Sequence, residues 1–270
     1  MKYNHFLIIA VLATLASLSC NKDKAISPDP HSVTKIQSET SYHADGTISD
    51  ATSYEYDNDA RLLKLKSLDN SYSTADYSTT MIIITYYNAD GTLDANQTEQ
   101  INLDSKGLAT SIIYTSTKKS AALNKPHLFK YSTNGNTTYS TTYNTDGFIL
   151  TRTIATPDYT NIVNHTITND NVTKEDEVYT PKGGTSSTYS FAYEYYTDKI
   201  NTIGMYNTGI YYNGKDNKNL YKKKTVISGS TSYILNNYEY EFDGKGRVSK
   251  IINKDASGTI SGWTTYVYND

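Results

Sequence analysis

Hydrophobic and polar residues alternate in short runs along most of this chain, and each run ends in a cluster of turn-forming residues. In Tyr54–Tyr56 and Tyr238–Tyr240, for example, two tyrosines flank a glutamate. Because successive side chains of a strand point to opposite faces, the rings share one face and the glutamate occupies the other. The pattern therefore predicts half-buried β-strands with one aromatic and one polar face.

One frame recurs where these strands reverse: an aromatic residue, Asp or Asn, two further residues, Gly, and an aliphatic residue two positions after Gly. The Asp or Asn side chain bonds the turn backbone, and Gly supplies a positive φ, so the frame predicts β-hairpins. In the copy Tyr54–Leu65 the glycine is replaced by Ala60, and we expect a different turn type there. The predicted structural turn residues are Asp57, Arg61, Gly91, Gly107, Gly147, Asp243, Gly246 and Arg247.

The copy around Gly246 has a second interpretation, a glycine loop that cradles a phosphate beside Lys245 and Arg247. Such a loop needs backbone amides that converge, usually at a helix N-terminus. A strand-like run follows Gly246. Other copies of the frame hold an aspartate at the position of Lys245, and an aspartate there would repel phosphate. The turn interpretation is favoured. Similarly, the lysines of 222–224 are predicted to be the solvated start of a strand, or protection of a strand edge, rather than a phosphate-binding patch.

Further turns are predicted at Asn134-Gly135, Gly183-Gly184 and Asn213-Gly214. The chain then forms a long antiparallel meander of roughly 12 to 16 strands. A sheet of that length must curl, split or close, because a flat one exposes its edges. The predicted fold class is all-β, a meander of hairpins that forms a strongly curved sheet or an open or closed barrel-like shell.

Composition supports this class and excludes one kind of partner. The chain has 27 Tyr among 270 residues, against 5 Phe and 1 Trp. Tyr fits the pleated, half-buried surface of a sheet. The net charge of −3 gives no basic footprint, so nucleic acid is not an expected partner.

The first twenty residues have the layout of a secretory signal peptide, because the apolar run 6–18 is too short to span a bilayer comfortably. The sole cysteine, Cys20, follows this run, and Leu18–Asn21 resembles a bacterial lipoprotein signal, although Ser17 stands where leucine is usual. The resemblance implies acylation of Cys20, attachment to the membrane through an N-terminal lipid, and an outer-membrane location on an undetermined side. Ordinary secretory cleavage is the alternative. Residues 21–32 then form a flexible tether and residues 33–270 a single domain.

The two copies with Arg61 and Arg247 resemble the YD repeat of Rhs-type proteins: Tyr-Asp, two residues, Gly-Arg, then an aliphatic residue. With its N-terminus, the chain resembles Bacteroidetes lipoproteins that carry YD-like repeats and form a domain family of unknown function. The resemblance implies hairpin geometry in a cell-envelope protein. Rhs proteins build a large shell around a toxin, and that function is not carried over to this much shorter chain.

Catalytic and metal-binding patterns are weak, and neither a metal nor a cofactor is predicted. Single histidines at 31, 43, 127 and 165 are expected in surface or turn positions. The acidic stretch 169–177 offers oxygen ligands for Ca²⁺ but lacks the central glycine of a calcium loop, so a solvated loop with strand-edge charges is favoured. Paired carboxylates for glycoside hydrolysis stay open, because their separation is a property of the fold.

Tyrosines are the remaining candidates for function. The rings of the Tyr-Glu-Tyr runs are predicted to form core, whereas Tyr206, Tyr211, Tyr212 and Trp263 lie outside the frame and are candidates for an exposed aromatic binding cluster. We therefore expect a non-enzymatic envelope lipoprotein that binds or scaffolds a glycan or protein partner. The alternatives are a self-associating structural subunit and a hydrolase that acts on polysaccharides.

Overall fold

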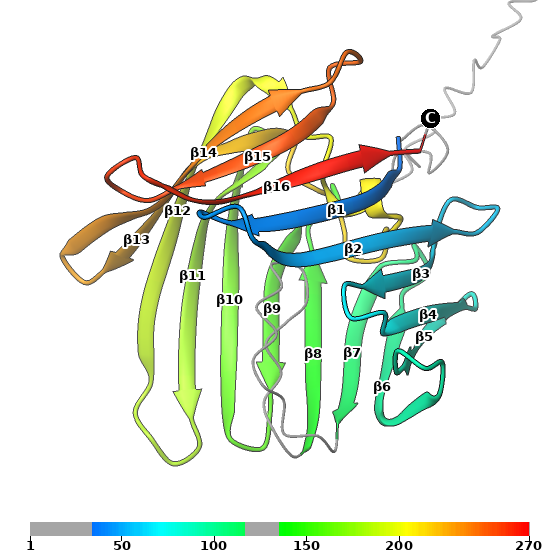
Figure 1. Ribbon diagram of the computed structural model, residues 1–270. Coiled ribbons are helices and arrows are strands. Elements are labelled where there is room, and N and C mark those ends of the chain that lie inside the picture. The colour runs from blue at the N-terminus through cyan, green and yellow to red at the C-terminus, as the bar shows by residue number, and fades with distance from the viewer. Residues whose placement is uncertain (1–33, 117–134, 270) are drawn as a thin grey trace, which may run out of the picture.

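The computed structural model describes residues 34–116 and 135–269. These residues form sixteen antiparallel strands that close into one barrel, in which every strand pairs with its neighbours along the chain and β1 pairs with β16 (Figure 1). The predicted all-β meander is confirmed, and of the three ways to protect its edges the sheet uses closure.

The strands are joined mostly by short turns, and their bounds are as follows. They are β1 (Ile36–His43), β2 (Ile48–Tyr56), β3 (Leu62–Ser67), β4 (Tyr72–Tyr77), β5 (Met81–Tyr87), β6 (Leu93–Leu103), β7 (Ala109–Ser116), β8 (Gly135–Tyr143), β9 (Ile149–Ala155), β10 (Tyr159–Thr168), β11 (Asn171–Pro181), β12 (Ser187–Ile200), β13 (Asn219–Ser228), β14 (Thr231–Phe242), β15 (Val248–Lys254) and β16 (Ile260–Tyr268).

The two frame copies with arginine form the same turn. In the β14–β15 turn, Asp243 Oδ1 accepts the backbone N–H of Arg247 at 2.9 Å, and Asp243 Oδ2 accepts Arg247 Nε at 2.7 Å. Asp57 holds Arg61 with the same two bonds, at 2.9 and 2.7 Å. Ala60 takes φ +59°, close to the +78° of Gly246, so the expected change of turn type is wrong. The bonds from Asp57 hold the alanine in a left-handed conformation, which costs a residue with a β-carbon about 1–2 kcal/mol of free energy.

A one-residue irregularity accompanies these turns. The pairing register shifts between Glu55 and Tyr56 in the β2–β3 hairpin, and between Glu241 and Phe242 in the β14–β15 hairpin. Such a bulge places two residues of one strand opposite one residue of its partner. The alternation of inward and outward side chains is therefore reset after each of these turns.

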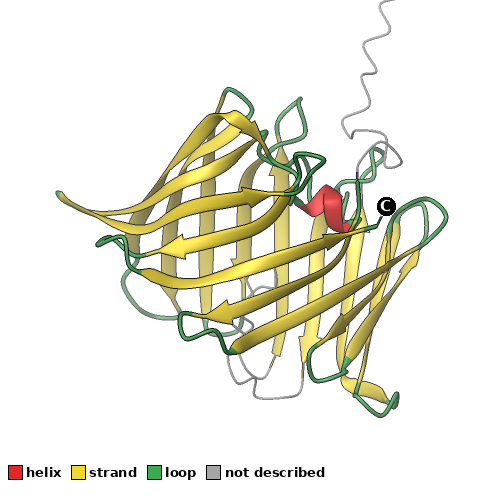
Figure 2. Ribbon diagram, turned by 45° about the horizontal axis from the view of Figure 1, so that its top comes forward, coloured by secondary structure: helices red, strands yellow, loops and turns green. Residues whose placement is uncertain are grey.

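Within the described residues, the meander is interrupted between β12 and β13 by residues 201–218, which include the 3₁₀-helix η2 (Met205–Thr208). We call residues 201–218 the cap segment. Its backbone carbonyls accept N–H groups from Leu62 (Gly209 O, 3.0 Å) and Ala109 (Tyr212 O, 2.8 Å). Since these strands lie apart around the ring, the segment reaches across one end of the barrel, and Figure 2 shows its helix within the ring of strands. The predicted Asn213-Gly214 hairpin turn is wrong, because it lies in this segment.

We call the end of the barrel that carries the cap segment the capped end, and the other the far end. The apolar core depends on the cap segment. In one cluster, Tyr212 packs against buried residues of β4–β8, including Ile82, Ile101 and Tyr139. In the other, Ile203 and Ile210 pack against residues of β1, β2, β3 and β16. The inward faces of the strands are thus buried against a segment that comes from elsewhere in the chain.

Candidate ligand cavity inside the barrel

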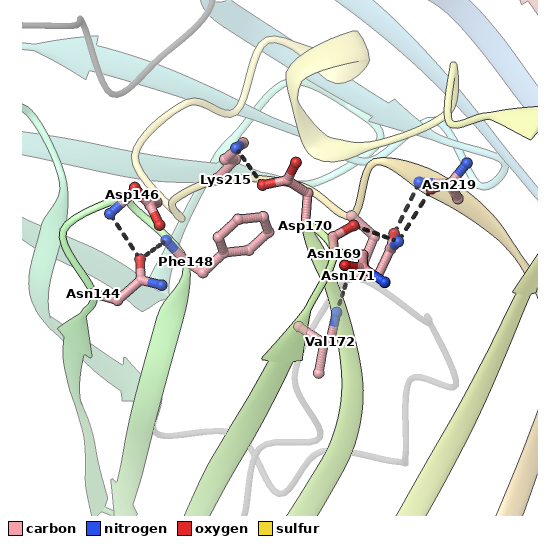
Figure 3. Close-up of polar contacts among 10 residues, drawn as sticks. Asn144, Asp146, Phe148, Asn169, Asp170, Asn171, Val172, Lys215 and Asn219 are labelled. Atoms are coloured by element: carbon pink, nitrogen blue, oxygen red, sulfur yellow. Dashed lines mark hydrogen bonds and ion pairs between the residues drawn. The ribbon is translucent and has the colours of Figure 1, made fainter. Parts of the chain in front are cut away.

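The cap segment is fastened to the β10–β11 turn by polar side chains (Figure 3). Lys215 Nζ lies 3.1 Å from Asp170 Oδ1. Asn171 Nδ2 donates to Asn219 Oδ1 at 3.1 Å, and Asn171 Oδ1 accepts the backbone N–H of Asn219 at 2.9 Å. The amide pair is buried. It therefore fixes the junction between the cap segment and β13 with little competition from water.

The β8–β9 turn forms a second attachment. Asn144 Oδ1 accepts the backbone N–H groups of Asp146 at 3.0 Å and Phe148 at 2.9 Å, which closes the turn (Figure 3). Phe148 is only 1% exposed, and Lys215 Nζ lies 4.8 Å from the centre of its ring. A β-carbon on Gly214 would lie 2.6 Å from the carbonyl oxygen of Gly147. The cap segment thus lies directly on this turn, backbone against backbone.

On the other side of the ring, the cap segment is held by the residues that precede β1. Lys35 Nζ donates to the carbonyl oxygen of Tyr206 at 3.0 Å, and Asn207 Nδ2 donates to that of Thr34 at 2.9 Å. Lys35 is 8% exposed, and desolvation lowers the pKa of its ammonium group to about 8. The ammonium group is therefore held in place at an energetic cost, because burial disfavours its charged form.

Between the cap segment and strands β1–β7 lies a cavity of about 560 Å³. Its apolar wall comes from both sides, with Leu65, Ile84 and Ile112 on the strands and Ile203 and Ile210 on the cap segment. It also reaches the turns of the far end, where residues 68, 69 and 88 line it. The space therefore runs along the inside of the barrel from the cap segment towards the far end.

Carboxylates of the cavity wall are oriented by tyrosine hydroxyls. Tyr54 Oη donates to Glu39 Oε1 at 2.9 Å, and Tyr86 Oη donates to Glu99 Oε2 at 2.8 Å. Glu99 is 8% exposed; burial raises the pKa of its carboxyl group, and the bond from Tyr86 opposes that effect only in part. Asp94 also lines the cavity and accepts Gln97 Nε2 at 2.6 Å. The cavity thus combines apolar surface with a few fixed acceptors.

A second polar cluster lies inside the barrel on strands β10–β13. His165 Nε2 lies 3.4 Å from Glu175 Oε1, and Tyr193 Oη donates to Glu175 Oε2 at 2.5 Å. Although burial raises the pKa of Glu175, the bonds from His165 and Tyr193 and the nearby charge of Lys224 bring it below its ordinary value. The expectation of a surface histidine is wrong here, since the His165 side chain is 12% exposed. The acidic stretch is a turn only at residues 169–170, because residues 171–177 belong to β11, where alternation turns Glu175 inward.

The other face of the strands carries ion pairs. Glu55 lies between Tyr54 and Tyr56, whose hydroxyls bond inside the barrel, so its side chain points outward to Lys64 at 3.5 Å. Glu239 reaches Lys254 at 2.5 Å in the same way, and Glu194 pairs with Lys223 near the middle of β12 and β13. The outer wall is therefore charged. No helix of the described residues is long and apolar enough to cross a membrane.

The predicted turn residues lie where hairpins reverse, but at two ends of the barrel. Gly91 is in the β5–β6 turn of the far end, whereas the others are at the capped end. Gly91, Gly107, Gly147 and Gly246 all have positive φ. Arg247 also stacks on Tyr268, with 4.3 Å between the guanidinium carbon and the ring centre. Cys20 lies outside the described residues.

The four aromatic residues predicted to form an exposed cluster do not do so. Tyr206 is 5% exposed, and Tyr211 and Tyr212 are half-buried in the same cap segment. They depart from the frame because they pack on the inside of the barrel rather than in a strand. Trp263 lies apart on β16, where its ring stacks on Tyr42 with 5.3 Å between centres.

The cavity residues Glu39, Asp94 and Glu99 were not singled out from the sequence. Each lies in or beside a strand, but none belongs to a Tyr-Glu-Tyr run. One feature of β6 could have indicated a polar interior: residues 94–100 are mostly polar, although they belong to an eleven-residue strand that continues into Ile101. Only the closed barrel and its cap segment show which side of that strand is enclosed.

No protein-family model matches this sequence, and no curated protein matches it. Among solved structures, the chain is similar to a porin-like protein from Bacteroides vulgatus, with a TM-score of 0.59 and 13% identity over 87% of this chain and 99% of that one. At this identity the likeness shows the fold, a β-barrel. TcdB2-TccC3 without its hypervariable C-terminal region matches over 77% of this chain and 12% of its own, with a TM-score of 0.23 and 13% identity. That TM-score is too low to infer a shared fold.

Proposed function

We propose that this protein is a cell-envelope lipoprotein that holds a small ligand inside its barrel, between the cap segment and strands β1–β7. The cavity of about 560 Å³ carries this proposal. Ligand sites are commonly concave spaces of about 300–1,000 Å³ with apolar and aromatic walls and a few placed polar groups. The oriented carboxylates and tyrosine rings of this cavity match that description. A non-enzymatic binding role, rather than a scaffold alone, is the function that the geometry supports best.

The lipid anchor belongs to the same proposal. An acylated Cys20 and a tether of residues 21–32 would join the barrel at the capped end, because β1 begins there at Ile36. The capped end would then face the membrane, and the far end would point away from it. An outer-membrane location follows from the signal-like N-terminus, and either side of that membrane satisfies the geometry.

Attachment beside the membrane, rather than a barrel across it, is supported by the charge of the outer wall. A lipid-facing barrel needs an apolar outer band about 25 Å tall, and a lysine or arginine at the bilayer midplane costs about 2–4 kcal/mol. Glu194 and Lys223 pair in the middle of their strands, and the pairs at Glu239 and Glu241 lie on the neighbouring hairpin. Such a surface is suited to water.

The binding role is tested by blocking the cavity. Ser73 lines it from β4, whereas Thr74 is the next residue and points to the other face. We expect a ligand found by thermal-shift screening to stabilise the wild-type protein and Thr74→Trp, but not Ser73→Trp. A ligand that stabilises all three equally binds elsewhere and contradicts the proposal. The melting temperature of each variant without ligand reports whether it folds.

A hydrolase is the second candidate, favoured by the carboxylates that share the cavity. Burial raises the pKa of Glu99, as a general acid requires, while a second carboxylate would act as base or nucleophile. Release of reducing ends from envelope or dietary oligosaccharides, lost in Glu99→Gln, would establish it. Absence of turnover by a folded wild-type protein on such a panel argues against it.

Self-association through a sheet edge has little structural support, because the closed barrel leaves no unpaired edge among the described strands. Association through a face of the wall is the form of this alternative that stays open. Light scattering at high concentration distinguishes it, since a persistent monomer is the result expected for a binding protein.

A further inference from the structure

Among the described residues, all charged side chains that line the cavity are acidic. Five carboxylate residues line it, and none of the described lining residues is a lysine, arginine or histidine. The acidic residues are Glu39, Asp50, Asp69, Asp94 and Glu99. We infer that the ligand of this cavity is an organic cation, a molecule that carries a protonated amine on an apolar or aromatic body. This inference rests on the proposed function, because it specifies the ligand class of the same site.

The carboxylates at Glu39 and Glu99 are positioned to accept further bonds. Tyr54 donates to one oxygen of Glu39, and Tyr86 donates to one oxygen of Glu99. A carboxylate has two oxygens and about four acceptor positions. One tyrosine hydroxyl therefore fixes the orientation of the carboxylate and leaves other acceptor positions for a ligand. Both donors are neutral. The strongest partner that such an acceptor takes is a charged N–H group, since charge-assisted bonds are about twice as strong as neutral ones.

Aromatic rings provide the second element of cation recognition. Tyr54, Tyr86 and Tyr212 line the cavity, the first two on strands and the third on the cap segment. The face of an aromatic ring attracts a cation within about 6 Å, and the attraction grows when water is excluded. Seven leucines and isoleucines add apolar surface to the wall. That surface favours an apolar or aromatic body on the ligand over a fully hydroxylated one.

Burial of Glu99 points the same way. Its side chain is enclosed, and desolvation raises the pKa of its carboxyl group. An ammonium group beside a buried carboxylate offsets the desolvation of both charges, which a neutral ligand does not do. A neutral sugar would gain hydrogen bonds from the same acceptors but would leave the one-sided charge in place. An anion would be repelled by it.

The test uses three molecules that share one body and differ in charge: tyramine, tyrosol and 4-hydroxyphenylacetate. Calorimetric titration into the full chain at pH 7 is expected to give at least tenfold tighter binding of tyramine than of tyrosol, and the weakest binding for the anion. Glu39→Gln with Glu99→Gln should weaken tyramine about tenfold and leave tyrosol unchanged. Glu55→Gln, on the outer wall, is the matched control and should change neither.

Equal or tighter binding of tyrosol overturns the organic cation, and loss of that binding in Ser73→Trp would still uphold the cavity as the ligand site. Stabilisation by calcium chloride but not by tyramine also overturns it, in favour of an inorganic cation. If none of the three molecules binds, the ligand found by the thermal-shift screen decides whether the cavity prefers a cation. A neutral or anionic ligand blocked by Ser73→Trp refutes only the cation, a cationic one supports it, and no ligand of any charge refutes the proposed function as well.

Discussion

The two ends of the barrel use one turn frame with opposite results. At the far end, the aliphatic residue that restarts the strand is exposed: Ile48 by 51%, Leu93 by 56% and Ile260 by 42%. At the capped end, most of the corresponding residues are buried, with exposures of 8% for Leu62, 1% for Ala109 and 0% for Val248, and Ile149 is half-buried. The turns themselves are alike. The difference comes from the cap segment, which covers one set and not the other.

The sequence carries a small mark of this difference. At the far end a threonine follows the glycine, and the hydroxyls of Thr47 and Thr92 donate to the aspartate two residues earlier, each at 2.6 Å. At the capped end the same position holds Leu108, Phe148 or an arginine. A polar residue there completes a solvated turn, whereas an apolar or stacking residue has a surface to pack on. The residue after the turn glycine therefore indicates which turns are covered.

The largest expected effect is at the most buried of these turns. Phe148→Ala should lower the free energy of unfolding by about 3–5 kcal/mol, because it leaves a cavity between the β8–β9 turn and the cap segment. Leu93→Ala, the same kind of truncation at the far end, should lower it by less than about 0.5 kcal/mol. Urea denaturation measures both. Similar losses in the two variants would mean that the cap segment does not pack on the turns.

Two glycines distinguish the free-energy cost of a positive φ from the cost of a steric clash at the β-carbon. Gly214 and Gly246 both have positive φ, but a β-carbon would meet the Gly147 carbonyl in the first and nothing within 4 Å in the second. Gly246→Ala should lower the free energy of unfolding by about 1 kcal/mol, and Gly214→Ala by about 2–4 kcal/mol. Equal losses in thermal or urea unfolding would contradict the close backbone approach.

Lys35 makes the capped end sensitive to pH. The pKa of its ammonium group is about 8 in the folded protein, against an ordinary 10.5. Between pH 8 and 10 the unfolded chain keeps a proton that the folded chain has released, so the free energy of unfolding should rise by about 2 kcal/mol. Above about pH 10 it should fall, because burial raises the pKa of many tyrosines, including Tyr54 and Tyr240, and the unfolded chain ionises first. Lys35→Met should flatten the rise but not the fall in a pH series of melts.

The fold could be predicted from the sequence because its turns and strands are encoded locally. Tyr54 is buried at 7% exposure, as its place in a Tyr-Glu-Tyr run predicts. Closure is not local, since Glu39 of β1 pairs with Tyr266 at the other end of the chain. A curved sheet and a closed barrel have the same turn chemistry, so the sequence left that choice open.

The site could not be predicted, for two physical reasons. Asn213-Gly214 has the composition of a hairpin turn, and the same positive φ serves a segment that packs inside a barrel. The bulges then reset the alternation after many turns, so inward and outward positions cannot be counted across them. Glu99 and Glu175 face the interior for reasons of register that only the assembled strands show.

The smallest expected effect tests the mark that distinguishes the two ends. Thr92→Val removes the hydroxyl that donates to Asp90 but keeps the shape of the side chain, so the free energy of unfolding should fall by less than about 1 kcal/mol. The same hydroxyl, with the backbone N–H of Thr92, lowers the pKa of Asp90. In Thr92→Val that pKa should rise towards its ordinary value, which an NMR titration of the Asp90 carboxyl measures. An unchanged pKa would mean that the threonine is not what completes the turn, and that its recurrence at the far end reflects strand propensity alone.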